Sequence, residues 1–281
     1  MKIYTQQNEL KNRISNEKKS GKTIGFVPTM GALHEGHLSL IIKSIKENDI
    51  TVTSIFVNPT QFNNSDDLKK YPRTLEADVQ MIKKISNEVL IYAPDPEDIY
   101  GNNVVSEKFD FNGLDKIMEG AFRAGHFDGV GTVVKKLFEI VMPNKAYFGE
   151  KDFQQLLIIK QMVIQTKLPV EVIPCPIVRD KNGLALSSRN QRLSPQRQEE
   201  AAHIYKTLTK AQELFKTQTS SQVEKWVKSQ FENKKGFDLE YFTITSEDNL
   251  APIDEKQPNQ TYRFFIAVYV DGVRLIDNLR A

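Results

Sequence analysis

The sequence predicts an α/β protein, with a Rossmann-like parallel sheet in an N-terminal domain and a smaller α+β C-terminal domain. Short, apolar, β-branched segments at 23–27, 50–57 and 88–92 alternate with helical patterns at 39–48 and 75–85. This strand and helix alternation is typical of parallel βαβ units with right-handed crossovers. We therefore expect one parallel sheet to organise the first part of the chain.

The other N-terminal elements are expected to extend this pattern. Residues 7–17 form a polar helical pattern that ends at Ser20-Gly21. Residues 94–125 contain several glycines, and we expect loops and short elements there. Further elements are predicted as a helix at 131–141, a strand at 145–148, a helix at 153–166 and a strand at 170–173.

Two prolines flank Cys175 and predict a boundary between domains of residues 1–176 and 177–281. Beyond it, Ser194 is expected to cap a helix that Pro195 begins, and a 3.6-residue apolar period follows as far as residue 215. The remaining elements are predicted as a helix at 220–232 and antiparallel strands at 239–244, 262–269 and, as a candidate third, 273–277.

Composition excludes several classes of protein. With 38 basic and 36 acidic residues, the chain has no global field that would favour nucleic acid or an anionic membrane. No apolar run approaches the ~18 residues of a membrane span, and the N-terminus does not resemble a signal peptide. A single cysteine excludes an internal disulfide and a multi-thiolate metal site, so we expect a cytoplasmic location.

The stretch from Pro28 to Leu40 is the strongest candidate for a ligand site. Glycines after a buried strand allow close backbone approach, and the N–H groups of the following helix favour phosphate. His34 and His37 lie three residues apart, so both imidazoles can face one volume and donate to phosphoryl oxygens. The stretch alone is equally compatible with an ordinary turn and two exposed histidines. Two of the chain's four histidines lie here, however, which favours a function.

Three further polar clusters follow predicted strands or turns. Ligands of open α/β sheets bind at the carboxyl ends of the strands. Asn58 and Gln61 could orient a polar substrate through their carboxamides, although an Asn-Pro turn would also explain Asn58. Residues 149–155 combine a glycine, a lysine and an acid suited to phosphate and Mg²⁺, and Ser187-Ser188-Arg189 could clamp phosphates. Each cluster alone has a plain surface alternative.

The segment 119–129 is predicted to be a mobile lid from which Arg123 could reach an anionic substrate. His126 and His203 have no evident polar partners in the sequence, and we expect structural roles for both.

Several motifs in order resemble the pantoate–β-alanine ligase (pantothenate synthetase) family, one of the nucleotidylyltransferases with a His-x-x-His-type signature. They cover almost the whole chain: VPTMGALHEGHLSL, SIFVNPTQF, YPRT, HFDGV, FGEKDFQQL, GLALSSRN and RLIDN. The resemblance implies that ATP, with Mg²⁺, activates pantoate as an acyl adenylate and releases pyrophosphate. The β-alanine amine then attacks to give pantothenate and AMP. It also implies a homodimer.

The resemblance implies a role for each matching residue. His37 and His34 would act on the phosphates as catalytic residues together with Lys151, and Gln61 and Gln155 would bind pantoate. ATP would be held by Met30, Gly31, Ala32, Leu33, His34, Glu35, Gly36, His37, Gly149, Glu150, Lys151, Asp152, Val178, Leu186, Ser187, Ser188 and Arg189. Asn58 and Arg123 complete the expected substrate site, and the Mg²⁺ ligands stay unassigned.

The chain departs from the family at two places and leaves two rival functions open. Arg123-Ala-Gly replaces a common Arg-Pro-Gly, which predicts a less rigid lid, and Tyr100-Gly-Asn-Asn103 replaces a Tyr-Pro-x-Gly turn.

Another adenylating enzyme, such as a tRNA synthetase fragment, is one rival function, but the near-neutral charge and small C-terminal region disfavour RNA binding. The second rival, a non-catalytic nucleotide sensor, would bind ATP tightly without releasing pyrophosphate.

Overall fold

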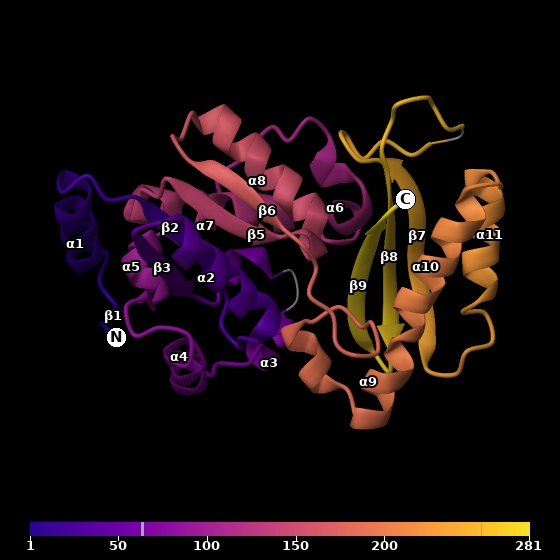
Figure 1. Ribbon diagram of the computed structural model, residues 1–281, viewed down its shortest axis with the longest axis horizontal. Helices are drawn as coiled ribbons and strands as arrows, with labels where there is room; N and C mark the ends of the chain where they lie inside the picture. Colours follow the sequence, from indigo (N-terminus) through magenta and orange to yellow (C-terminus); the bar gives the residue numbers. More distant parts are fainter. Residues whose placement is uncertain (63–64, 254) are drawn as a thin grey trace. The chain divides into compact units, whose positions relative to one another are not determined.

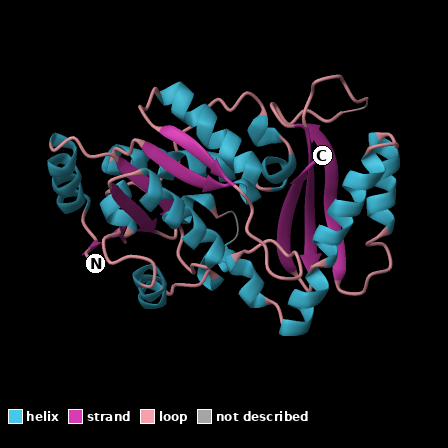
Figure 2. Ribbon diagram, in the orientation of Figure 1, coloured by secondary structure: helices cyan, strands magenta, loops and turns pink. Residues whose placement is uncertain are grey.

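The computed structural model describes residues 1–62, 65–253 and 255–281, with the backbone alone for 65–67 (Figures 1 and 2). It divides into two compact units. The N-terminal unit comprises Met1–Glu150 and Gln154–Pro176, and the C-terminal unit comprises Lys151–Phe153 and Ile177–Ala281. The predicted division of function, between a nucleotide- and pantoate-binding domain and a smaller lid domain, stays a prediction.

The N-terminal unit is built on a six-stranded parallel sheet of order β1-β4-β3-β2-β5-β6, which confirms the predicted fold class. From β2 the chain runs outward to β3 and β4, then returns to place β5 on the other side of β2. This reversal puts the topological switch point, where such sheets bind ligands, beside the loop after β2. The strands are β1 (Ile3–Tyr4), β2 (Ile24–Thr29), β3 (Ile50–Ile55), β4 (Leu90–Tyr92), β5 (Lys145–Gly149) and β6 (Glu171–Cys175).

Helices cover both faces of this sheet. A Cβ on Gly25 would lie 2.2 Å from the Ser44 hydroxyl of α2, whereas the ring of Phe26 packs edge-on against Phe138 of α7. Successive strand residues face opposite sides, so α2 and α7 lie on opposite faces. The helices are α1 (Gln7–Lys19), α2 (Glu35–Glu47), α3 (Ser65–Lys70), α4 (Leu75–Lys83), α5 (Pro96–Tyr100), α6 (Met118–Phe122), α7 (His126–Val141) and α8 (Phe153–Thr166), with single 3₁₀ turns η1 (Pro59–Gln61), η2 (Leu114–Lys116) and η3 (Glu150–Asp152).

Two of these helices begin earlier than the sequence predicts. The helix expected from residue 39 begins at Glu35, because His34 caps it, and the helix expected from residue 131 begins at His126. In sequence Gly129 favours a loop, but a Cβ on it would lie 2.3 Å from the Thr60 carbonyl oxygen, so close packing explains this glycine.

In the described part of the chain, no helix has the length and apolar character that crossing a bilayer requires.

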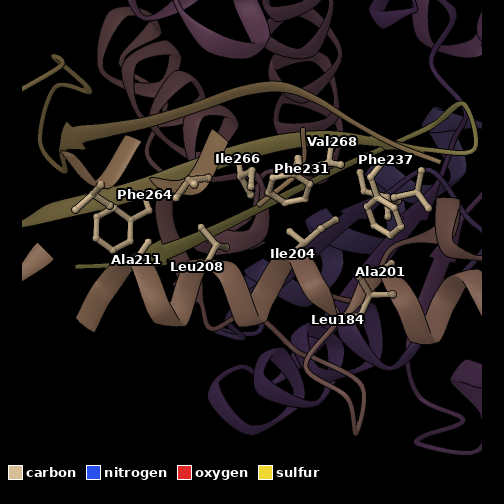
Figure 3. Close-up of a cluster of buried hydrophobic side chains, with 14 of the residues drawn as sticks. Leu184, Ala201, Ile204, Leu208, Ala211, Phe231, Phe237, Phe264, Ile266 and Val268 are labelled. Carbon is tan, nitrogen blue, oxygen red and sulfur yellow. The ribbon is translucent and has the colours of Figure 1, made fainter. Parts of the chain in front are cut away.

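The C-terminal unit packs helices on a three-stranded antiparallel sheet of order β7-β8-β9. Figure 3 shows Ile204, Leu208 and Ala211 along α10, directed at the β8 side chains Phe264 and Ile266. The 3.6-residue period is thus confirmed, as are the third strand and the Ser194 cap. The elements are η4 (Ser188–Arg192), α9 (Pro195–Ala201), α10 (His203–Phe215), α11 (Ser220–Ser229), β7 (Phe237–Ser246), β8 (Tyr262–Val270) and β9 (Val273–Arg280).

Cys175 ends β6 inside the apolar core of the N-terminal unit and is 3% exposed. Burial raises the pKa of its thiol to about 11. Because the thiolate is the reacting form, we expect an aromatic disulfide reagent at pH 8 to label native protein at least about 10²-fold more slowly than urea-unfolded protein. Stopped-flow absorbance measures both rates, and equal rates would contradict this burial.

Candidate active site

The loop that joins β2 to α2 contains two left-handed residues at the switch point, and this conformation is unfavourable for the second, Ala32. Gly31 and Ala32 both have left-handed dihedrals, with φ of 81° and 49°. A Cβ on Gly31 would lie 3.0 Å from a carboxylate oxygen of Asp78, so only glycine fits without displacing its neighbours. Gly31, which the sequence predicts to let the backbone approach a ligand, therefore also lets the backbone of this loop approach α4.

A buried carboxylate holds this loop in place. Asp78 of α4 is 1% exposed, and its two oxygens accept from the backbone N–H groups of Ala32 at 3.0 Å and Leu33 at 2.7 Å. Val79 and Ile82 of the same helix are also buried. Sequence reasoning missed Asp78, and the available signal was an acid on the apolar face of a predicted helix.

His34 and His37 lie side by side at the N-terminus of α2. Their ring centroids are 4.0 Å apart with planes inclined by 37°. The His34 Nδ1 accepts from the Gly36 N–H at 3.2 Å, and the His37 Nδ1 accepts from the His34 N–H at 3.3 Å. The predicted proximity of the rings is confirmed, although His34 caps the helix and does not lie within it.

These capping bonds determine which ring nitrogen can donate. A nitrogen that accepts from a backbone N–H carries no proton, so each neutral ring has its proton on Nε2. The structure thus places two Nε2–H donors at a helix N-terminus, where the backbone already favours negative charge. Such an arrangement suits a phosphate chain whose negative charge increases during reaction.

Asn58 and Gln61 form a bonded pair after β3. The Asn58 Nδ2 donates to the Gln61 Oε1 at 3.2 Å and to the Gly129 carbonyl at 3.3 Å, and its Oδ1 accepts from the Tyr100 hydroxyl at 2.6 Å. Asn58 is 1% exposed, so it is suited to orient Gln61 more than to contact a substrate itself. Gln61 in turn donates from Nε2 to the Met30 sulfur at 2.7 Å, which joins this pair to the loop after β2.

The segment predicted to be a lid comprises most of α6, a turn at residues 123–125 and the start of α7, and it supports Gln61. The Gln61 carbonyl oxygen lies 2.8 Å from the His126 Nδ1 and 3.4 Å from an Arg123 guanidinium nitrogen. His126 is buried and touches Arg123 through its other nitrogen, at 3.1 Å, so it holds backbone in place as expected. Arg123 therefore lies beside the predicted pantoate-binding glutamine.

Residues 149–155 are divided between the two units. Gly149 ends β5, the neighbour of β2, and so lies at the same sheet edge as Met30. Lys151 and Asp152 belong to the C-terminal unit, where their side chains form an ion pair of 3.7 Å. Gln155 is partly exposed on α8, whereas its buried neighbour Gln154 bonds to backbone groups of residues 114–119.

The remaining predicted nucleotide residues lie together in a hairpin of the C-terminal unit. Arg179 pairs with Ala185, and the Leu186 N–H donates to the Val178 carbonyl at 3.0 Å. Ser187 then caps η4 by accepting from the Arg189 N–H at 3.3 Å. The hairpin thus brings Val178 beside the Leu186 to Arg189 segment, which is compatible with the prediction that these residues contact the same nucleotide.

Comparisons with known proteins agree on one family. The family model described as pantoate-beta-alanine ligase matches residues 2–280. A pantothenate synthetase of Flavobacterium psychrophilum is 54% identical over 279 residues, which cover 99% of each chain. The crystal structure of a pantothenate synthetase from Thermus thermophilus has a TM-score of 0.90 and 37% identity, and covers 99% of both chains.

A second solved structure is a complex. It is the pantoate-beta-alanine ligase of Francisella tularensis complexed with beta-gamma ATP and β-alanine, at 37% identity and a TM-score of 0.79, covering 100% of this chain and 97% of the other. The family match spans nearly every residue of the chain. The chain belongs to the pantoate–β-alanine ligase family.

Proposed function

We propose that this protein joins pantoate to β-alanine through a pantoyl adenylate, converting ATP to AMP and pyrophosphate. The observation that carries the proposal is the pair of imidazole rings of His34 and His37, with centroids 4.0 Å apart, at the N-terminus of α2. The family match over residues 2–280 and the relative solved with ATP and β-alanine support the choice of substrates.

In the first step a pantoate carboxylate oxygen attacks the α-phosphorus of ATP, and the bond to the bridging oxygen breaks. Pyrophosphate leaves with the electron pair of that bond. His34, His37 and the positive end of the α2 dipole stabilise the charge that increases on the phosphates, and Lys151 supplies a further cation. In the second step the β-alanine amine attacks the carbonyl carbon, loses a proton and expels AMP.

We assign the pantoate contacts to polar side chains of the N-terminal unit. Gln61 presents a carboxamide to pantoate, and Gln155 does so from α8. We assign Asn58 an indirect role, because its Nδ2 donates both to Gln61 and to the Gly129 carbonyl and its Oδ1 accepts from Tyr100, so both N–H groups of the buried carboxamide are used within the protein. Arg123 lies against the Gln61 backbone and adds positive charge for the carboxylates of the substrates.

Mg²⁺ fits this scheme as a partner of the ATP phosphates. Within residues 1–62, 65–253 and 255–281, no group of three or more His, Cys, Asp or Glu side chains is arranged to hold a metal ion. Mg²⁺ commonly binds through one or two carboxylates plus substrate phosphates, which needs no such group. Asp152, whose side chain is 47% exposed, is the carboxylate that we assign to this role.

We also propose that the protein is a cytoplasmic homodimer, as the family resemblance implies. A dimer would sediment with twice the 32.2 kDa mass of the chain. Sedimentation equilibrium over a range of concentrations measures this mass directly.

The proposed reaction is tested with purified protein, ATP, Mg²⁺, pantoate and β-alanine. We expect pyrophosphate and AMP in equal amounts, and no pyrophosphate when pantoate is omitted. ATP binding without either product would favour the nucleotide sensor. Pyrophosphate release that does not depend on pantoate would favour a different adenylating enzyme.

A further inference from the structure

The dipeptide Asp277-Asn278 on β9 is buried, polar and unused in the chemistry proposed above. It belongs to the RLIDN motif, and its two side chains are 4% and 1% exposed. Buried polar groups need partners, so the bonds of this pair show which parts of the unit it holds. All of the residues involved belong to the C-terminal unit.

Asn278 holds the backbone of Lys151. Its Nδ2 donates to the Lys151 carbonyl at 2.9 Å, and its Oδ1 accepts from the Arg263 guanidinium at 2.6 Å. Arg263 is 5% exposed, forms an ion pair with Glu247 and stacks 3.9 Å from the centre of the Phe153 ring. One side chain of β9 and one of β8 therefore fix both ends of the short segment that carries Lys151.

Asp277 holds the hairpin that leads into the Leu186 to Arg189 segment. Its oxygens accept two bonds from the Arg179 guanidinium, at 2.6 and 2.9 Å. The same guanidinium donates to the Gly183 carbonyl at 3.1 Å and to the Asn278 carbonyl at 3.2 Å. A two-pronged Arg–carboxylate bond fixes direction as well as distance, so the hairpin is tied to β9 in one orientation.

Adjacent residues of one strand thus hold two segments that the family resemblance assigns to the nucleotide, and the proposed function gives Lys151 of the first segment a charge-stabilising role. Lys151 also interacts electrostatically with Asp277. Burial raises the pKa of the Asp277 carboxyl, and the positive charges of Arg179 and Lys151 oppose that increase. Stabilisation by fixed charges depends on accurate placement, and a displacement of about 1 Å can cost about 10²-fold in rate.

We propose that Asp277 and Asn278 are positioning residues of the adenylation step, which set Lys151 and the Leu186 to Arg189 segment at a fixed spacing. This inference rests on the proposed function. Neither side chain needs to contact a substrate, because each acts through a residue that it holds.

A double-mutant cycle tests the inference. Asn278→Ala is expected to lower kcat for pantoate-dependent pyrophosphate release about 10- to 100-fold, with the pantoate KM within about twofold of wild type. In a Lys151→Ala background the same substitution should cost less than about twofold, because the residue it positions is absent. Asn278→Asp, which keeps the volume and the acceptor for Arg263 but lacks the donor, should behave like Asn278→Ala.

Matched controls make each outcome decisive. Glu240→Gln removes a partly buried ion pair with Arg274, which lies four residues before Asn278 on β9, and should leave kcat unchanged. Equal losses from Asn278→Ala with and without Lys151, or wild-type kcat in a folded Asn278→Asp protein, would overturn the inference. Wild-type protein measured in parallel separates the two claims, since an inactive wild type overturns the proposed function and this inference with it.

Discussion

Replacing His37 with alanine is expected to lower the rate of adenylate formation by about 10²-fold or more, on the scale of a lost oxyanion contact. The His37 Nδ1 is occupied by the His34 N–H, so its Nε2–H is the group that can donate to a phosphate. Quenched-flow measurement of pyrophosphate release gives the rate. The fold should survive, because the ring is only partly buried at the helix end.

His37→Asn is the matched control for this experiment. An asparagine oxygen can replace Nδ1 as the acceptor for the His34 N–H, but no donor then stands at the position of Nε2. If Nε2 acts on the phosphates, His37→Asn should be as slow as His37→Ala. Near-wild-type turnover in His37→Asn would instead show that capping α2 is the role of His37.

Replacing Asp78 with alanine is expected to destabilise the protein by about 2–4 kcal/mol and to weaken ATP binding. The substitution leaves the Ala32 and Leu33 N–H groups without their acceptors, and each unsatisfied buried group costs about 1–3 kcal/mol. The strained left-handed backbone at Ala32 would also lose its support. Urea unfolding measures the stability, and calorimetry measures the ATP affinity.

Asp78→Asn separates the two contributions of this carboxylate. The amide keeps one acceptor oxygen, so we expect an intermediate loss of stability and of ATP affinity. An Asp78→Ala protein with wild-type stability and affinity would show that the loop holds its shape without α4.

The parallel sheet could be predicted from sequence because β-branched runs and helical periods are local patterns. β1 could not, since its two residues, Ile3–Tyr4, are too few to show a period. The start of α7 could not be predicted either, because a glycine lies within its first turns. Glycine favours a loop in sequence, but Gly129 is needed in a helix where it packs against the Thr60 carbonyl.

The candidate site could be predicted where its residues are neighbours in sequence. The spacing of His34 and His37 is visible in the chain, and so is the polar cluster around Lys151. Asp78 is not, because one acid in a helix looks like a surface acid until the loop that it binds is known. Asn278 lies 127 residues from Lys151, and no local pattern shows such a bond.

The fate of one oxygen atom tests the proposed reaction most directly. Pantoate labelled with ¹⁸O in its carboxylate is converted with ATP, Mg²⁺ and β-alanine, and the AMP is analysed by mass spectrometry. An adenylate intermediate transfers one labelled oxygen to AMP, because the attacking oxygen leaves with the phosphate. AMP that carries no ¹⁸O, in a reaction that still forms pantothenate, would contradict the account.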